Sequence, residues 1–69
     1  MKEVDARGFS CPMPVIMVQK EVRANAPAEL AVLVDEMCAV ENVTRFGESQ
    51  GYAVSHTEEG DDFRVLLKK

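Results

Sequence analysis

The 69-residue sequence is poor in the residue types on which many binding and catalytic sites depend. It has no tryptophan, one tyrosine, one histidine and two cysteines. The two cysteines lack Cys-x-x-Cys spacing and do not by themselves complete a zinc site. The acidic pairs Glu58-Glu59 and Asp61-Asp62 lack the ligand spacing of a calcium loop and are typical of a solvated hairpin tip. We therefore expect neither a metal ion nor an organic cofactor.

Long hydrophobic runs and clusters of basic residues are also missing. No run of about 18 apolar residues is present, and Met1–Asp5 lacks the apolar stretch of a signal peptide, so we expect a cytoplasmic protein without a membrane span. Eight basic residues stand against twelve acidic ones, a net charge of −4, and no basic cluster exceeds Lys68-Lys69. This balance argues against direct binding of nucleic acid, which needs several contacts from lysine or arginine to phosphate.

The hydrophobic content of 46% is typical of a globular chain, and its length predicts a single domain over residues 1–69. Val15, Val18 and Val22 form one apolar stripe at helical spacing. The continuous apolar run from Leu30 to Val34 favours a strand buried on both faces in the middle of a sheet. Strands are expected at 2–5, 30–34, 52–58 and 62–68, with helices from about residue 12 or 14 to 24 and from just after Asp35 to just before Gly51.

The element order βαβαββ predicts the fold class. A strand–helix–strand crossover makes the first two strands parallel, and the turn at Glu59-Gly60-Asp61 makes the last two antiparallel. The expected fold is α/β (α+β), a two-layer sandwich in which two helices cover one face of a mixed four-stranded sheet. Both strand-to-helix turns then lie at one edge of the sheet, where open α/β sheets usually bind ligands.

Cys11 lies in the first of these turns, directly before the predicted first helix. Proline is well tolerated in the first turn of a helix, so Pro12 and Pro14 place the thiol at the helix N-terminus. Unpaired N–H groups and the positive end of the helix dipole stabilise a thiolate there, and the thiolate is the reactive form of cysteine. The alternative is a small buried residue at a helix cap.

Candidates for supporting roles precede Cys11 in the sequence, namely Asp5, Arg7 and Gly8. Arg7 is positioned to stabilise a thiolate or persulfide anion, and Asp5 to hold Arg7 or the turn backbone. The alternative for this pair is a solvated ion pair at the end of a strand. Gly8 is expected to supply a backbone conformation that side chains disfavour. Asp35 is expected to be a turn residue or a cap of the second helix.

Cys38 is interpreted as a packing residue at the start of the second helix. The alternative is a residue that resolves a disulfide or accepts sulfur from Cys11. His56 is expected on a strand, at the surface or half-buried, away from Cys11. Met13 and Met17 are expected in the core or at its rim. If they are exposed beside Cys11, they provide an adaptable apolar surface for docking.

The motif Asp5-x-Arg7-Gly8-x-x-Cys11-Pro12-x-Pro14 resembles that of the TusA/SirA/YedF family of small sulfur carriers. The similarity covers essentially the whole chain, and Val40–Phe46 with Ser49–Tyr52 resembles the YedF branch in particular. The resemblance implies a βαβαββ sandwich in which Cys11 carries a persulfide and passes sulfur between proteins. It assigns no role to Cys38.

The leading hypothesis is therefore a sulfur carrier or sulfurtransferase that holds a persulfide on Cys11. Its partners would be a donor protein resembling a cysteine desulfurase and an acceptor protein. The alternatives are a non-catalytic regulatory or protein-binding module, and a selenium carrier that uses the same residue. The sequence leaves the donor, the acceptor, the occurrence of catalysis and the oligomeric state open.

Overall fold

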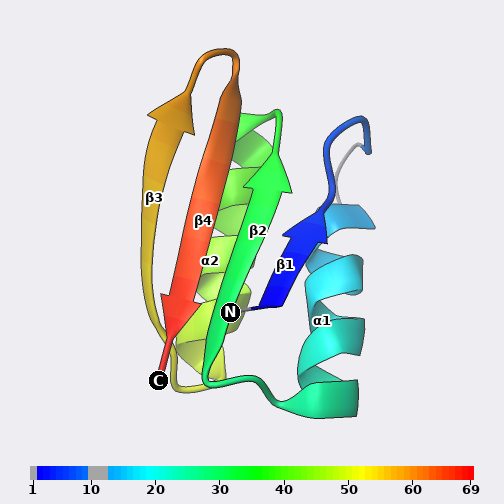
Figure 1. The fold of residues 1–69 in the computed structure, drawn as a ribbon, viewed down its shortest axis with the longest axis vertical. Coiled ribbons are helices and arrows are strands. Elements are labelled where there is room, and N and C mark those ends of the chain that lie inside the picture. Colours follow the sequence, from blue (N-terminus) through cyan, green and yellow to red (C-terminus); the bar gives the residue numbers. More distant parts are fainter. Residues whose placement is uncertain (1, 10–12) are drawn as a thin grey trace.

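The computed structural model describes residues 2–9 and 13–69 and confirms the predicted element order (Figure 1). Each predicted element is found, and its bounds agree with the prediction to within about one residue. The elements are β1 (Lys2–Asp5), α1 (Met13–Asn25), β2 (Glu29–Val34), α2 (Met37–Ser49), β3 (Ala53–Glu59) and β4 (Asp62–Lys68).

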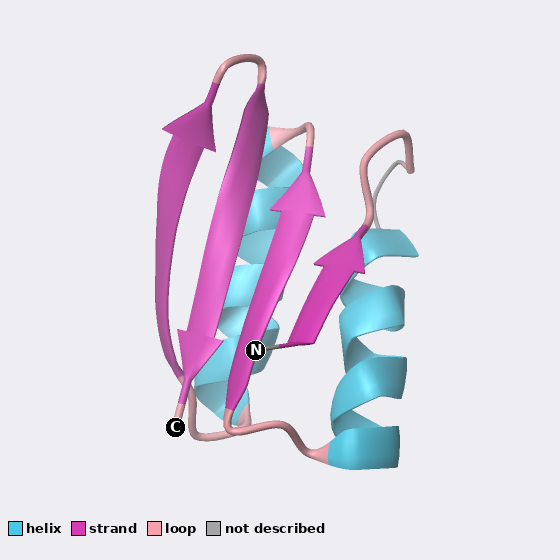
Figure 2. Ribbon diagram, viewed as in Figure 1, coloured by secondary structure: helices cyan, strands magenta, loops and turns pink. Residues whose placement is uncertain are grey.

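The four strands form one mixed sheet in the order β1-β2-β4-β3. β1 pairs with β2 in parallel, while β4 pairs antiparallel with both β2 and β3. Figure 2 shows α1 and α2 side by side on the same face of this sheet, which makes the molecule a two-layer sandwich. These observations confirm the predicted fold class and the central position of the second strand.

The core lies between the sheet and the two helices. Strand residues that share a register row point to the same face, so Val4, Val32 and Val65 form one row of this core. Val18, from the predicted apolar stripe of α1, is fully buried, and so is Val43 of α2. The other buried apolar residues are Ala6, Leu30, Ala31, Val34, Ala39, Val40, Tyr52 and Leu67.

The second face of the sheet carries no helix, yet Ala31 of β2 has no exposed surface on it. The Nη1 atom of Arg64 on β4 donates to Glu3 Oε2 on β1 at 3.0 Å. Because β2 lies between these strands, the arginine side chain crosses β2, and a small residue there leaves room for it. The prediction that this strand is buried on both faces is therefore correct at Ala31 of β2. Leu33, on the same face as Ala31, is only half-buried.

The end of α2 agrees with the predicted end of this helix just before Gly51. Gly51 adopts φ +90°, and its N–H donates to the carbonyl of Glu48 at 3.1 Å. Tyr52 follows, and its hydroxyl donates to the carbonyl of Pro27 at 2.6 Å. This bond ties the end of α2 to the connection between α1 and β2. None of the helices that the structure describes is long and apolar enough to cross a membrane.

Candidate functional site

One end of the sheet brings together three connections that are distant in sequence. The loop after β1, the loop after β2 and the β3–β4 hairpin all lie at the end where β1 and β2 finish (Figure 1). We call this end the carboxyl edge and define it by residues 5–9, 13, 35–37 and 58–64. The predicted convergence of the two strand-to-helix turns is therefore correct. Cys11 and Pro12 belong to the first turn in sequence and lie outside the described residues.

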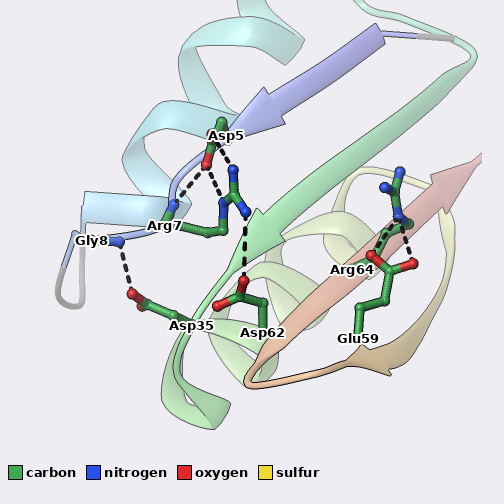
Figure 3. Close-up of polar contacts among 7 residues, drawn as sticks. All are labelled: Asp5, Arg7, Gly8, Asp35, Glu59, Asp62 and Arg64. Atoms are coloured by element: carbon green, nitrogen blue, oxygen red, sulfur yellow. Dashed lines mark hydrogen bonds and ion pairs between the residues drawn. The ribbon is translucent and has the colours of Figure 1, made fainter.

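Asp5, the last residue of β1, binds Arg7 through both carboxylate oxygens. Arg7 Nε donates to Asp5 Oδ1 and Arg7 Nη2 to Asp5 Oδ2, each at 2.9 Å (Figure 3). The backbone N–H of Arg7 also donates to Oδ1, at 3.2 Å. Asp5 therefore holds both the side chain of Arg7 and the backbone of the turn, as the sequence predicted.

This geometry changes the acid–base properties of both groups. The side-chain hydrogen bonds from Arg7, supplemented by the backbone bond, lower the pKa of Asp5 to about 2. The bonds to Asp5 raise the pKa of Arg7 in turn, and Asp62 of the hairpin adds to this effect. Arg7 Nη1 lies 3.5 Å from Asp62 Oδ2. The interpretation of Asp5 and Arg7 as an isolated solvated pair is therefore incomplete, because the arginine also links the first loop to the hairpin.

Gly8 adopts φ +85°, which confirms that this position needs a conformation that L side chains rarely adopt. A Cβ built at Gly8 meets no atom within 4 Å, so the backbone conformation, and not space, favours glycine here. Its N–H donates to Asp35 Oδ2 at 2.8 Å, across 27 positions of sequence (Figure 3).

Asp35 was expected to be a turn residue or a cap of the second helix, and it is not the cap. The N-cap of α2 is Glu36, and no side-chain hydrogen bond caps this helix. Asp35 directs its carboxylate to Gly8 instead and thereby fastens the loop after β2 to the loop that leads to Cys11. An aspartate directly after the central strand was the available signal, but its partner could be identified only when the two loops were placed together.

The first turns of the two helices complete the carboxyl edge. Pro14 is buried in the first turn of α1, the position in which proline is tolerated. Met13 is 40% exposed and is therefore not a core residue, whereas Met17 is partly buried against the core, as predicted. Met37, the first residue of α2, and Phe9, in the loop after β1, are each 44% exposed.

Cys38 is exposed in the first turn of α2, so its interpretation as a packing residue is wrong. Asn42 Nδ2 approaches its sulfur at 3.8 Å, one helical turn further along. The cysteine lies three residues after Asp35 and thus close to the carboxyl edge.

His56 is exposed on β3, as predicted. It borders an open groove of about 470 Å³ between α2 and β3. Its neighbours in this groove include Met37, Thr44 and Arg45 of α2. Among residues 2–9 and 13–69, no three side chains of His, Cys, Asp or Glu gather in a way that could hold a metal ion.

Comparisons with known proteins agree on one family. The model of the family described as sulfurtransferase TusA matches residues 2–69. A candidate sulfur carrier protein of Methanocaldococcus jannaschii is 41% identical over 71 residues, which cover 100% of this chain and 95% of that protein. The sulfur carrier protein TusA of Allochromatium vinosum is 30% identical, over 99% of this chain and 92% of its own length.

A crystal structure of another protein has the same fold as this chain. The SirA-like protein of Desulfitobacterium hafniense superposes with a TM-score of 0.86 and is 28% identical. The match covers 97% of this chain and 95% of that one.

Proposed function

Because this chain belongs to the sulfurtransferase TusA family, we propose that it is a sulfur carrier that holds a persulfide on Cys11 and relays sulfur between two proteins. One observation carries the assignment of the residue. In sequence, Cys11 stands between Phe9 and Met13, both of which belong to the carboxyl edge, and the family match spans residues 2–69.

The chemistry needs a nucleophilic thiolate and no further group. The Cys11 thiolate attacks the outer sulfur of a donor persulfide, forms a new S–S bond and releases the donor thiolate. The sulfane sulfur then stands on Cys11 as a persulfide anion. An acceptor thiolate attacks this outer sulfur, takes it and leaves the Cys11 thiolate behind. Each step exchanges one S–S bond for another, so no external oxidant or reductant is consumed.

The surroundings of the loop support this role for Cys11. The N–H groups at the beginning of α1 and the helix dipole favour an anion on a residue just before the helix. Gly8 and Arg7 hold the first part of the loop to two other connections, the loop after β2 and the β3–β4 hairpin. A loop restrained in this way loses less entropy when its thiol is brought to a partner.

The supporting residues have distinct proposed tasks. Pro12 and Pro14 shape the entry to α1, and Gly8 provides the turn conformation. Asp5 and Arg7 restrain the loop, and Arg7 links it to Asp62 of the hairpin. The donor is a protein of the cysteine desulfurase kind and the acceptor is a second protein. A reactive thiol must stay reduced between transfers, which supports the cytoplasm as the location.

Sulfur loading of the reduced protein tests the proposal directly. The protein is incubated with cysteine persulfide, and its intact mass is measured before and after treatment with a reductant. We expect a gain of one sulfur atom that the reductant removes, that Cys11→Ser abolishes and that Cys38→Ser leaves unchanged.

The two cysteine variants make the result specific for one residue. Both serine variants should show the wild-type circular dichroism spectrum, so that a lost mass gain reports chemistry and not unfolding. Retention of the labile sulfur in Cys11→Ser would contradict the assignment, as would its loss in Cys38→Ser alone.

A further inference from the structure

The exposed large apolar side chains of the described residues are confined to the carboxyl edge. They are Phe9, Met13 and Met37, with exposed fractions of 44%, 40% and 44%. Phe9 and Met13 stand two residues before and two residues after Cys11 in sequence. Phenylalanine and methionine are enriched in protein interfaces, and methionine adapts its shape to different partners. Their placement indicates a surface that contacts another protein around the reactive thiol.

The charge of the molecule is concentrated at the same edge. Among the described residues of the carboxyl edge, seven carboxylates stand against two arginines, a net charge of −5. The rest of the chain has five carboxylates and six lysines or arginines, a net charge of +1. The carboxylates of the edge are Asp5, Asp35, Glu36, Glu58, Glu59, Asp61 and Asp62. The negative charge of the protein therefore belongs to this edge.

Both arginines of the edge are already matched by carboxylates. Arg7 pairs with Asp5 and Asp62, while Arg64 pairs with Glu3 at 3.0 Å and with Glu59 at 3.2 Å. Within the described part of the chain, four carboxylates of the edge have no ion pair. Asp35 accepts the Gly8 N–H, which leaves Glu36, Glu58 and Asp61. These charges face solvent and remain available to a partner.

We propose that the carboxyl edge is the docking surface for the protein that delivers sulfur, and that this protein presents basic residues around an apolar recess. The inference rests on the proposed function, because it assumes that sulfur is exchanged at Cys11. A basic partner fits the net charge of −5, and an apolar recess accommodates Phe9 and Met37. A second copy of this chain fits poorly, because two such edges repel each other.

Peptide persulfides provide a test that does not require the natural donor. Three short peptides carry one cysteine persulfide each. The first has flanking lysines and a neighbouring leucine, the second has glutamates in place of the lysines, and the third has serine in place of the leucine. In each case the Cys11 thiolate takes the outer sulfur and releases the peptide thiolate. All proteins carry Cys38→Ser, so that the gain in mass reports Cys11.

Two double variants separate local from general charge effects. Glu36→Gln with Glu58→Gln removes two carboxylates from the carboxyl edge. Glu29→Gln with Glu48→Gln removes two exposed carboxylates from the opposite end of the molecule. Both changes are the same in chemistry and in net charge. They therefore differ only in position.

At low salt we expect the lysine peptide to load the wild type roughly tenfold faster than the glutamate peptide. The ratio of the two loading rates should shrink at high salt and in the variant Glu36→Gln with Glu58→Gln. It should persist in the variant Glu29→Gln with Glu48→Gln. Met37→Ser should remove the advantage of leucine over serine. Free cysteine persulfide should load every variant at a similar rate.

The outcomes distinguish a failure of the docking surface from a failure of the sulfur-carrier function. Equal rates for the three peptides on the wild type overturn the docking surface, and so does a charge preference that both double variants lose equally. In either case, loading by cysteine persulfide leaves the carrier function intact. A wild type that takes sulfur neither from the peptides nor from cysteine persulfide overturns the proposed function itself.

Discussion

The hydrogen bond between Gly8 and Asp35 offers a quantitative test of how the loop before Cys11 is held. Asp35→Ala removes the carboxylate that accepts the Gly8 N–H at 2.8 Å. A hydrogen bond of this kind at an exposed site contributes about 0.5–1.5 kcal/mol. The loop should therefore open roughly twofold to tenfold more often in the variant.

Amide hydrogen exchange at Gly8 measures this opening directly. We expect exchange of the Gly8 N–H to accelerate by that factor in Asp35→Ala, while buried amides of β2, such as that of Val32, keep their protection. Asp35→Asn retains an acceptor oxygen and should recover most of the protection. Both variants remove a negative charge near the N-terminus of α2, so their difference isolates the hydrogen bond from the helix dipole.

The same pair of variants connects the loop to function. If the restrained loop presents Cys11, loading by cysteine persulfide should slow in Asp35→Ala and recover in Asp35→Asn. Unchanged exchange at Gly8 in Asp35→Ala would show that Asp35 does not restrain the loop. Faster exchange with unchanged loading would show that the restraint is structural and does not assist the transfer of sulfur.

Two further predictions concern the charge network and the core. Arg7→Met should raise the pKa of Asp5 from about 2 toward its ordinary value of 3.8, measured by NMR titration of the carboxyl group, and a value still near 2 would contradict the assigned cause. Since this pKa is lowered in the folded protein, the stabilisation by the pair is complete above about pH 4 and is lost as the pH falls through about 2. Gly47→Ala should lower the free energy of unfolding by about 1 kcal/mol, because a Cβ there lies 2.7 Å from methyl groups of Leu67 and Val54, and this overpacking exceeds the gain in helix propensity. Denaturant unfolding measures this change, and a more stable variant would contradict the reasoning.

Much of the candidate site follows from short stretches of sequence. Asp5 and Arg7 are two residues apart, so their contact forms within a single turn and could be predicted without the fold. The positive φ of Gly8 was predictable for the same reason. The outcome was different for Cys38, because exposure in the first turn of α2 depends on how that helix lies on the sheet.

The role of Asp35 illustrates where sequence reasoning reached its limit. A polar residue between a strand and a helix is usually a turn or cap residue, and the local pattern offered no other partner. The actual partner, Gly8, is 27 positions away and meets Asp35 only because β1 and β2 are parallel neighbours that end at the same edge. The location of Phe9 and Met37 at the same end of the sheet has the same origin, since each follows one of these two strands.

The sequence by itself determined the helices, the strands, the hairpin and the position of Cys11 before α1. These features depend on hydrophobic periodicity, proline and glycine, whose effects act between residues a few positions apart. Only the tertiary structure decided the strand order β1-β2-β4-β3, the bridge from Arg64 across β2 to Glu3, and the joining of loop and hairpin by Arg7 and Asp62. Many strand orders are compatible with the same local pattern. The choice among them depends on how the apolar faces of all six elements can be buried together, and such long-range packing leaves no periodic signal in the chain.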